Sequence, residues 1–140
     1  MTQRTHRKFR VPNADMRRYV EQLKPFQNKN ETCHGEWGPD DTGTLYAVFS
    51  YRTWPMFIYD PAADMWFENT EKVSVTTSSH HTKTRPHNVA PEKFVPMERV
   101  DMLLLISAGS YAAYCADRIR AAAEDGAAEE AVNRITSMPA

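Results

Sequence analysis

Residues 45–87 read LYAVFSYRTWPMFIYDPAADMWFENTEKVSVTTSSHHTKTRPH, and this stretch decides the fold. Three runs rich in aromatic and branched residues, at 45–51, 56–60 and 65–68, are separated by short segments that contain Pro55 and Pro61. A fourth run, at 73–79, is rich in β-branched residues, which favour strands. Because connections this short join antiparallel neighbours, the stretch predicts a β-meander.

The first run indicates a central strand, because apolar side chains alternate onto both of its faces. Polar segments at 27–44 predict loop with at most one short strand near 35–37. Residues 80–95 contain two prolines and basic residues, and they predict a loop. One face is expected to carry Leu45, Ala47, Phe49 and Tyr51, and the other Tyr46, Val48 and Ser50.

Helical patterns flank the meander. Asn13 is suited to an N-cap, and Met16, Tyr19, Val20 and Leu23 follow at helical spacing until Lys24-Pro25, so residues 13–24 predict a helix. Residues 96–137 predict a C-terminal helical region in which Pro96 occupies a first turn. Its long helix, near 97–124, is expected to pack on the core, and Gly126 is expected to stop or kink it.

The predicted fold class is therefore α+β, with an antiparallel meander of three to five strands in residues 36–79. The helix at 13–24 and the long C-terminal helix are expected to pack it. A chain of 140 residues is the size of one domain. Residues 1–12 are expected to form a basic arm.

Composition predicts a protein of a cytoplasmic, reducing compartment. The longest apolar run, 102–106, is far short of the roughly 20 residues that cross a bilayer. The basic N-terminus lacks the apolar segment of a secretory signal. Two isolated cysteines predict no disulfide framework.

Charge is unevenly distributed although the net charge is -1. Residues 1–30 carry eight Lys or Arg and two acidic residues, which gives +6. Such an excess predicts either contact with a polyanion or a solvated chain end. The cations expected to track phosphates are Arg4, Arg7, Lys8, Arg10, Arg17 and Arg18.

The strongest candidate site is the hydroxyl, histidine and cation block at the end of the meander. Hydroxyls and cations can bind phosphate oxygens through charge-assisted hydrogen bonds, and exposed aromatic rings can stack on bases. The alternatives are hydroxyls that pair across the sheet and aromatic rings that form the core. The candidate ligands are Thr76, Thr77, Ser78, His80, Lys83 and Arg85, and the candidate rings are Tyr51, Trp54 and Trp66.

Two further site types have weaker support. No Cys-x-x-Cys pair accompanies the residues of metal-ligand type, so we expect neither a metal nor a cofactor. A hydrolase could combine Ser78 or Ser79 with His80 and a carboxylate, but no nucleophile elbow or phosphate-binding glycine loop is present. The potential metal ligands are Cys33, His34, His80, His81 and His87, and the carboxylates are Asp64 and Glu68.

Several of these motifs occur together, in order, between residues 37 and 87. They are Ser50-Tyr51, the strand at 56–60, the segment Trp66-Phe67-Glu68-Asn69, and Lys72 followed by Ser74-Val75-Thr76-Thr77-Ser78 and His80. This order resembles a family of small, largely uncharacterised proteins encoded by bacteriophages and prophages. Arg52 stands where that family has glycine, and Val73 where it has tyrosine. The resemblance implies a phage or prophage setting, and therefore the cytoplasm of a host, and no particular reaction.

The resulting expectation is a phage-derived, non-enzymatic accessory protein that binds nucleic acid or a nucleotide. One alternative is a protein-directed inhibitor of a host defence system, anti-CRISPR-like, in which acidic residues mimic phosphates toward a basic host protein. Another is a hydrolase that uses the His80 region. A homodimer through the C-terminal helix stays open. The acidic residues are Asp40, Asp41, Asp60, Asp64, Glu124, Asp125, Glu129 and Glu130.

Overall fold

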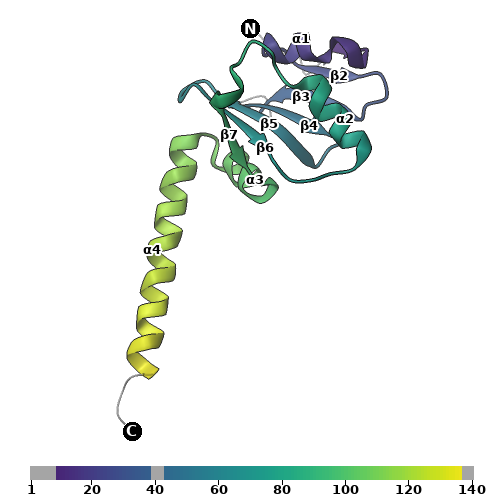
Figure 1. The fold of residues 1–140 in the computed structure, drawn as a ribbon. Helices are drawn as coiled ribbons and strands as arrows, with labels where there is room; N and C mark the ends of the chain where they lie inside the picture. Colours follow the sequence, from purple (N-terminus) through teal and green to yellow (C-terminus); the bar gives the residue numbers. More distant parts are fainter. Residues whose placement is uncertain (1–8, 39–42, 137–140) are drawn as a thin grey trace.

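The computed structural model describes residues 9–38 and 43–136, in which seven strands form one mixed, mostly antiparallel sheet. The strands lie in the sheet in chain order (Figure 1). The two outermost pairs, β1 with β2 and β6 with β7, are parallel, and the other pairs are antiparallel. The strands are β1 (Phe9–Val11), β2 (Phe26–Asn28), β3 (Cys33–Trp37), β4 (Tyr46–Ser50), β5 (Trp54–Asp60), β6 (Met65–Asn69) and β7 (Phe94–Met97).

Helices cover both faces of this sheet. The helices α1 (Met16–Glu21) and α2 (Val75–Thr84) contact each other, and the core on their side contains Met16, Phe26 and Val48. On the opposite face, Met102 and Leu105 of α3 (Arg99–Ala108) pack on Ile58. The predicted α+β class is confirmed.

The prediction for the centre of the meander is confirmed. All five residues of β4 are buried, as expected of a strand covered on both sides. Tyr46 and Val48 belong to the core on the α1 side, whereas Leu45, Ala47 and Phe49 belong to the core on the α3 side. The alternation of apolar side chains therefore reports the two faces correctly from Leu45 to Ser50. Tyr51, expected on the face of Phe49, follows the end of β4, and its ring lies 5.9 Å from that of His80 on the α2 side.

The predicted strand at 73–79 is wrong, because this segment begins α2. Ser74 caps the helix, since its side chain accepts a hydrogen bond from the Thr77 amide at 3.3 Å. Thr77, His80 and Thr84 are buried at a spacing of three and four residues, which is the period of a helix. Tertiary contacts thus override the strand preference of a run rich in β-branched residues.

The loop predicted at 80–95 is replaced by the end of α2, a short 3-10 helix at Pro91–Lys93, and the start of β7. Since β7 runs parallel to β6, the chain needs the crossover that α2 provides. Pro96 therefore lies in an edge strand, where its missing N–H costs no ladder bond, and not in a helical first turn.

The N-terminal predictions are correct in part. Residues 13–24 begin as a 3-10 helix at Asn13–Asp15 and continue as α1, which ends at Glu21. The expected arm contributes β1, and residues 1–8 lie outside the described residues. The one short strand expected near residues 35–37 is β3, which begins earlier, at Cys33, whereas β2 lies largely in a segment expected as loop. The sheet therefore has more strands than the three to five expected.

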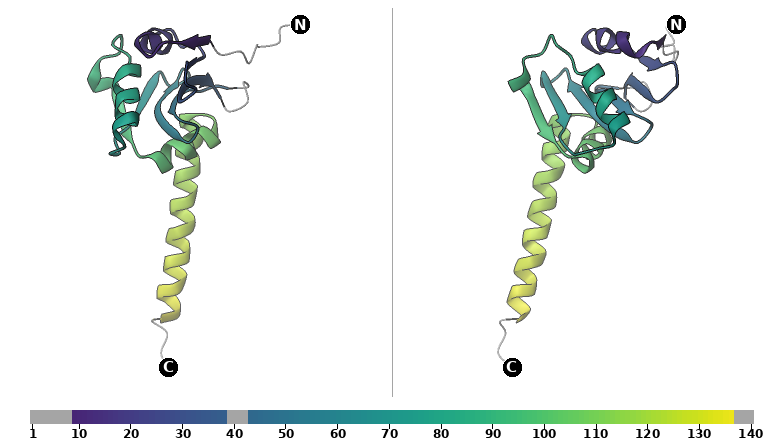
Figure 2. Two further views of the ribbon diagram at one scale, coloured as in Figure 1. Left: turned by 90° about the vertical axis from the view of Figure 1, so that its right-hand side faces the viewer. Right: turned by 45° about the vertical axis from the view of Figure 1, so that its right-hand side comes forward.

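The C-terminal region breaks at Gly109, with a φ of 87°, and not at Gly126. A left-handed residue at this position is a common end for a helix, and α4 (Tyr111–Thr136) begins two residues later. The helix runs through Gly126 and extends away from the domain (Figures 1 and 2). Only its first turns, with Tyr111 and Tyr114, pack on the core, so the expected packing of the whole helix is wrong.

Among the described helices, including the 26 residues of α4, none is both long enough and apolar enough to cross a membrane.

Candidate functional site: the two faces of α2

The inner face of α2 is fixed to the sheet by a buried polar network. Ser50 Oγ, on β4, lies 3.0 Å from Thr77 Oγ1 and 2.8 Å from His80 Nδ1. Thr84 Oγ1 donates to the His80 carbonyl at 2.7 Å. The side chains of Ser50, Thr77, His80 and Thr84 are all buried, so their hydrogen bonds replace those that water would make.

This network holds the fold together and does not form an open binding site. Burial lowers the pKa of His80 below 6.5, and the charge of Lys83 lowers it further. The imidazole is therefore neutral at pH 7. Because Thr77 and His80 face the sheet, they do not present their polar atoms to a phosphate, in contrast to the expected rim.

The outer face of α2 carries the other expected ligands. Thr76, Ser78 and Lys83 are exposed, and so is Thr82. None of the ten residues of α2 is acidic. The sequence block is therefore divided by the helix into an inner set that holds the fold and an outer set that faces solvent.

One arginine of α1 adjoins this outer face at the C-terminal end of α2. Arg17 donates from Nε to the Arg85 carbonyl at 2.8 Å and from Nη2 to the Thr82 carbonyl at 2.7 Å. It thereby caps the carbonyl end of α2, where the helix dipole favours a cation. Arg18 is exposed one residue further along and lies 4.0 Å from Asp15. We call Arg17, Arg18, Thr76, Thr82 and Lys83 the α1–α2 face.

Arg85, one of the cations expected at the site, does not belong to the α1–α2 face. Its guanidinium pairs with Glu68, and it also lies over the Phe94 ring at 4.4 Å. The same carboxylate is 2.7 Å from His81 Nε2. Burial alone would raise the pKa of Glu68, but the hydrogen bond with His81 and the charge of Arg85 lower it below 4.5. Glu68 therefore stays ionised. It lines an open groove together with Glu71, Lys72, Ser78 and Thr82, so this groove carries acidic as well as basic side chains.

The stacking candidates have very different environments. Trp66 is buried between Tyr59 and Phe94, and Trp54 is half-buried beneath the Arg99 guanidinium. Tyr51 is 45% exposed, with its ring 5.9 Å from that of His80. Of the three expected rings, Tyr51 is the one open to a base.

Phe9 is an exposed ring that the sequence reasoning did not select. Its side chain is 62% exposed and packs on Tyr19 of α1 at 6.2 Å, while Arg18 lies 5.7 Å from the Tyr19 ring. Its position between Lys8 and Arg10 was the available signal, because aromatic residues among cations are typical of nucleic-acid contacts.

The expected basic arm is only partly described. Arg4, Arg7 and Lys8 lie outside the described residues, whereas Arg10 lies on β1 and pairs with Glu31. Because Phe9 packs on Tyr19, the chain segment that contains the arm joins the domain beside α1.

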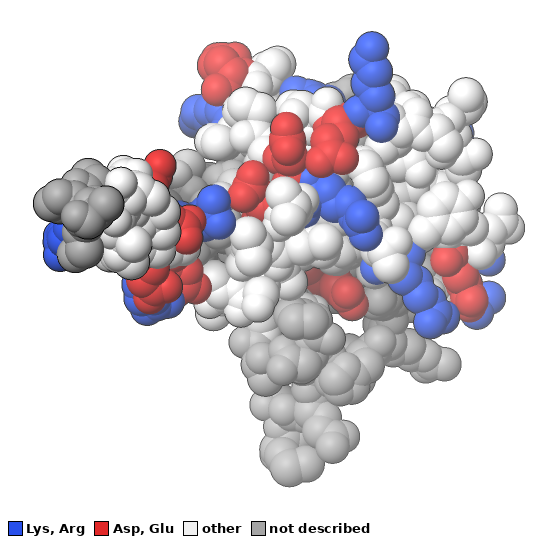
Figure 3. Space-filling view, turned by 90° about the horizontal axis from the view of Figure 1, so that it is seen from below, with Lys and Arg blue, Asp and Glu red and all other residues white. Residues whose placement is uncertain are grey.

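Charges of both signs are interleaved on the underside of the domain, from which α4 projects (Figure 3). Among the described residues of this face, no surface of a single sign is visible on which a polyanion would lie.

The potential metal ligands do not converge. Within residues 9–38 and 43–136, no group of three or more His, Cys, Asp or Glu could hold a metal ion. Cys33 is buried, which raises its pKa to about 12. His34, its neighbour on β3, points to the opposite face and stacks on Phe49 at 5.1 Å.

The hydrolase arrangement is not assembled among the expected residues. His80 contacts Ser50, which is buried, whereas Glu68 contacts His81 and Asp64 accepts a hydrogen bond from the Tyr59 hydroxyl at 2.7 Å. The predicted hydrolase site pairs Glu68 with His80, whereas in the structure Glu68 contacts His81. The two histidines point about 100° apart because they are consecutive residues of a helix.

The acidic residues expected to mimic phosphates do not lie together on one surface. Asp60 is buried and accepts from the Tyr111 amide at 2.8 Å and the Ala62 amide at 2.9 Å, so it fixes the start of α4. Asp40 and Asp41 lie outside the described residues. The exposed acidic residues of that set on α4 are Glu124, Asp125, Glu129 and Glu130.

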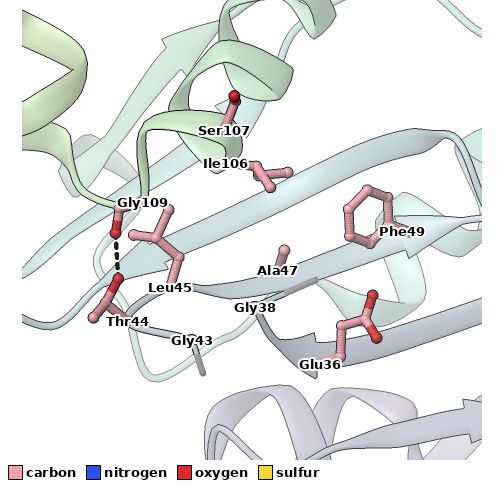
Figure 4. A pocket seen from close by; sticks show the side chains of 10 residues that line it. All are labelled: Glu36, Gly38, Gly43, Thr44, Leu45, Ala47, Phe49, Ile106, Ser107 and Gly109. Atoms are coloured by element: carbon pink, nitrogen blue, oxygen red, sulfur yellow. Dashed lines mark hydrogen bonds between the residues drawn. The ribbon is translucent and has the colours of Figure 1, made fainter. Parts of the chain in front are cut away.

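A small cavity of about 260 Å³ lies on the α3 side of the sheet (Figure 4). Its apolar lining includes Leu45, Ala47, Phe49 and Ile106, and Glu36 stands at its rim. It lies on the face of the sheet opposite α2.

The chain matches no protein-family model, no curated protein and no solved structure.

Proposed function

We propose that the protein binds nucleic acid, with a preference for single strands, through the α1–α2 face and the basic segment that joins it. The supporting observation is the outer face of α2, which contains no acidic residue and offers hydroxyls and Lys83. Arg17 contacts the end of this helix, and the exposed Arg18 follows it on α1. Phosphate oxygens accept hydrogen bonds from such donors without reading the base sequence.

The exposed rings support single strands over a duplex. Phe9 and Arg18 both lie against the Tyr19 ring, and the Tyr51 ring lies beside that of His80. A base that is not paired can stack on such a ring, and this contact is tolerant of sequence. The phage or prophage setting implied by the resemblance is compatible with an accessory protein of this type.

The test is fluorescence anisotropy with a labelled oligothymidine of about 20 nucleotides over a series of salt concentrations. We expect the logarithm of the affinity to fall linearly with the logarithm of salt, because bound phosphates release counterions. In the double variant Arg18→Ala with Lys83→Ala, we expect the affinity to fall about tenfold and the slope to decrease by about 1.4, at about 0.7 per lost phosphate contact.

The matched control is Arg118→Ala with Arg120→Ala, which removes the same charge from α4. The control should bind like the wild type. Equal losses in both variants, or binding that is independent of salt, would contradict the proposal.

A second candidate, a protein-directed inhibitor, rests on the four exposed acidic residues of α4. In a pull-down from nuclease-treated host lysate, this candidate predicts that the protein retains a basic host protein. A variant in which the four acidic residues are neutralised should no longer retain it.

A further inference from the structure

α3 lies mainly over two strands of its side of the sheet. Its main contacts are with β5 and β6, where Met102 and Leu105 pack on Ile58 and Phe67. The neighbouring strands β3 and β4 form the adjoining part of this side, and they approach α3 near its C-terminal end, at Ile106 (Figure 4). A hollow is therefore left between the end of the helix and these two strands.

A small residue on β4 gives this hollow its depth. Ala47 lies between Leu45 and Phe49 on the α3 side of the strand, and its cross-strand neighbour on β3 is Glu36. The resulting cavity has a volume of about 260 Å³ (Figure 4). A cavity of about 150 Å³ with apolar walls already holds benzene. This cavity therefore has room for one six-membered ring with a short substituent.

Glu36 supplies the charge of the cavity, and its side chain is held in place. The Glu36 carboxylate lies 3.3 Å from Nε2 of His34, which is two residues earlier on β3 and therefore on the same face. The His34 ring in turn stacks on Phe49 at 5.1 Å. Both polar side chains are mostly buried. A ligand would therefore meet a carboxylate whose position the fold already sets.

The other polar groups at the cavity also leave acceptors for a ligand. The Thr44 hydroxyl donates its hydrogen to the Gly109 carbonyl, so its lone pairs stay available (Figure 4). The Gly38 amide is already used, because it donates to the Leu45 carbonyl at 2.8 Å. None of the described residues that line the cavity is Lys or Arg. The cavity is therefore complementary to a group that is positively charged and donates hydrogen bonds.

We infer that this cavity binds a small organic cation in which a primary ammonium group is attached to an apolar body the size of one ring. The ammonium group contacts Glu36 through a charge-assisted hydrogen bond, and the ring lies over Ala47 between Phe49 and Ile106. A few polar groups in an apolar cavity are the usual composition of a small-molecule site. Since the cavity and the α1–α2 face lie on opposite sides of the sheet, this inference is independent of the nucleic-acid proposal.

The test is a titration of the isotope-labelled full chain with benzylamine at neutral pH, followed by the amide chemical shifts. Benzyl alcohol and benzoate are the matched probes, because they have the same ring with a neutral and a negative group. We expect benzylamine to bind with a dissociation constant of about 1 mM, which is ordinary for a ligand of this size. The largest shifts should fall at Glu36, Ala47 and Ile106. Benzyl alcohol should bind at least tenfold more weakly, and benzoate more weakly still.

Glu36→Gln tests the charge, because it keeps the shape of the side chain. It should weaken benzylamine at least tenfold and change the affinity for benzyl alcohol by less than about twofold. The matched control is Glu92→Gln, which removes the same charge from an exposed position just before β7, three strands away from β3 in the sheet order. The control should bind both probes like the wild type.

Ala47→Ile tests the cavity itself, because it fills the space from the sheet with a residue that suits a strand. The variant should weaken benzylamine at least tenfold while its amide spectrum stays that of a folded protein. Four results would each overturn the inference: no binding of benzylamine to the wild type up to about 20 mM, equal affinities for benzylamine and benzoate, equal behaviour of Glu36→Gln and Glu92→Gln, or wild-type affinity in folded Ala47→Ile. If Ala47→Ile does not fold, the two glutamine variants decide.

Discussion

Two helices, α2 and α4, hold their conformation for opposite reasons. α2 is ten residues long, contains four threonines and two serines, and is helical because Thr77, His80 and Thr84 pack on the sheet. α4 is 26 residues long, contains nine alanines, and is helical with almost no packing beyond its first turns. Tertiary contacts can therefore stabilise a helix whose residues have poor helix propensity, and high helix propensity can stabilise one that makes few contacts.

This difference also separates the proposed functions. The sheet fixes one side of α2, so its other side can present donors in a defined geometry. α4 offers a long surface that no other described element occupies after its first turns, and the second candidate function rests on its exposed acidic residues. The nucleic-acid proposal depends on the α1–α2 face and the inhibitor proposal on α4, so each can fail without the other.

The largest expected effect comes from removing the anchor of α2. His80→Ala should lower the free energy of unfolding by about 2–4 kcal/mol, because it leaves a cavity and deprives the Ser50 and Thr77 hydroxyls of a partner. Urea denaturation measures this change. Lys83→Ala, on the outer side of the same helix, is the control and should change stability by less than about 0.5 kcal/mol. Equal losses in the two variants would show that α2 does not depend on its inner face.

A smaller effect is expected from pH. The pKa of His80 is lower in the folded state than the 6.5 of a free imidazole, so the unfolded chain takes up a proton first as pH falls. This contribution to stability is complete above pH 6.5 and decreases below it, at no more than about 1.4 kcal/mol per pH unit.

His80→Gln should remove this part of the pH dependence and leave the contributions of the other histidines. Unfolding curves at pH 7.5 and pH 5.5 for both proteins give the difference. Identical pH dependence in the two would mean that His80 is not held neutral by the fold.

The smallest effect is expected in α4. No atom lies within 4 Å of a Cβ built on Gly126, so Gly126→Ala adds helix propensity without a clash. We expect α4 to gain about 0.5–1 kcal/mol in helix stability and the sheet to melt at an unchanged temperature. Ellipticity at 222 nm reports the helix, and tryptophan fluorescence reports the sheet. A shift of the tryptophan transition would indicate that α4 and the sheet unfold together.

The sequence predicted those parts of the fold in which apolar residues form short runs bounded by turns or recur at helical spacing. The strands β4, β5 and β6 fall on such runs, and Met16 and Val20 identify the face of α1 that is buried. The α+β class follows from these elements.

The sequence did not predict α2, since the residues that α2 buries are polar. Thr77, His80 and Thr84 have helical spacing, but hydrophobic periodicity cannot detect them, and threonines favour strands locally. For the same reason, the candidate block was read as one surface, although the helix turns Thr77 and His80 inward and leaves Thr76, Ser78 and Lys83 outside. The strands β1, β2 and β7 have only three or four residues, too few for a pattern.

Native-state hydrogen exchange, followed by NMR, tests most directly the claim that α2 is held by the sheet and α4 by its own sequence. We predict that the amides of α2 at residues 79–84 exchange with the free energy of global unfolding, and that those of α4 beyond residue 118 exchange through opening events of much lower free energy. Under the same account, His80→Ala lowers protection in α2 and leaves α4 unchanged. Protection of α2 that is as low as that of α4 in the wild-type protein would contradict the account.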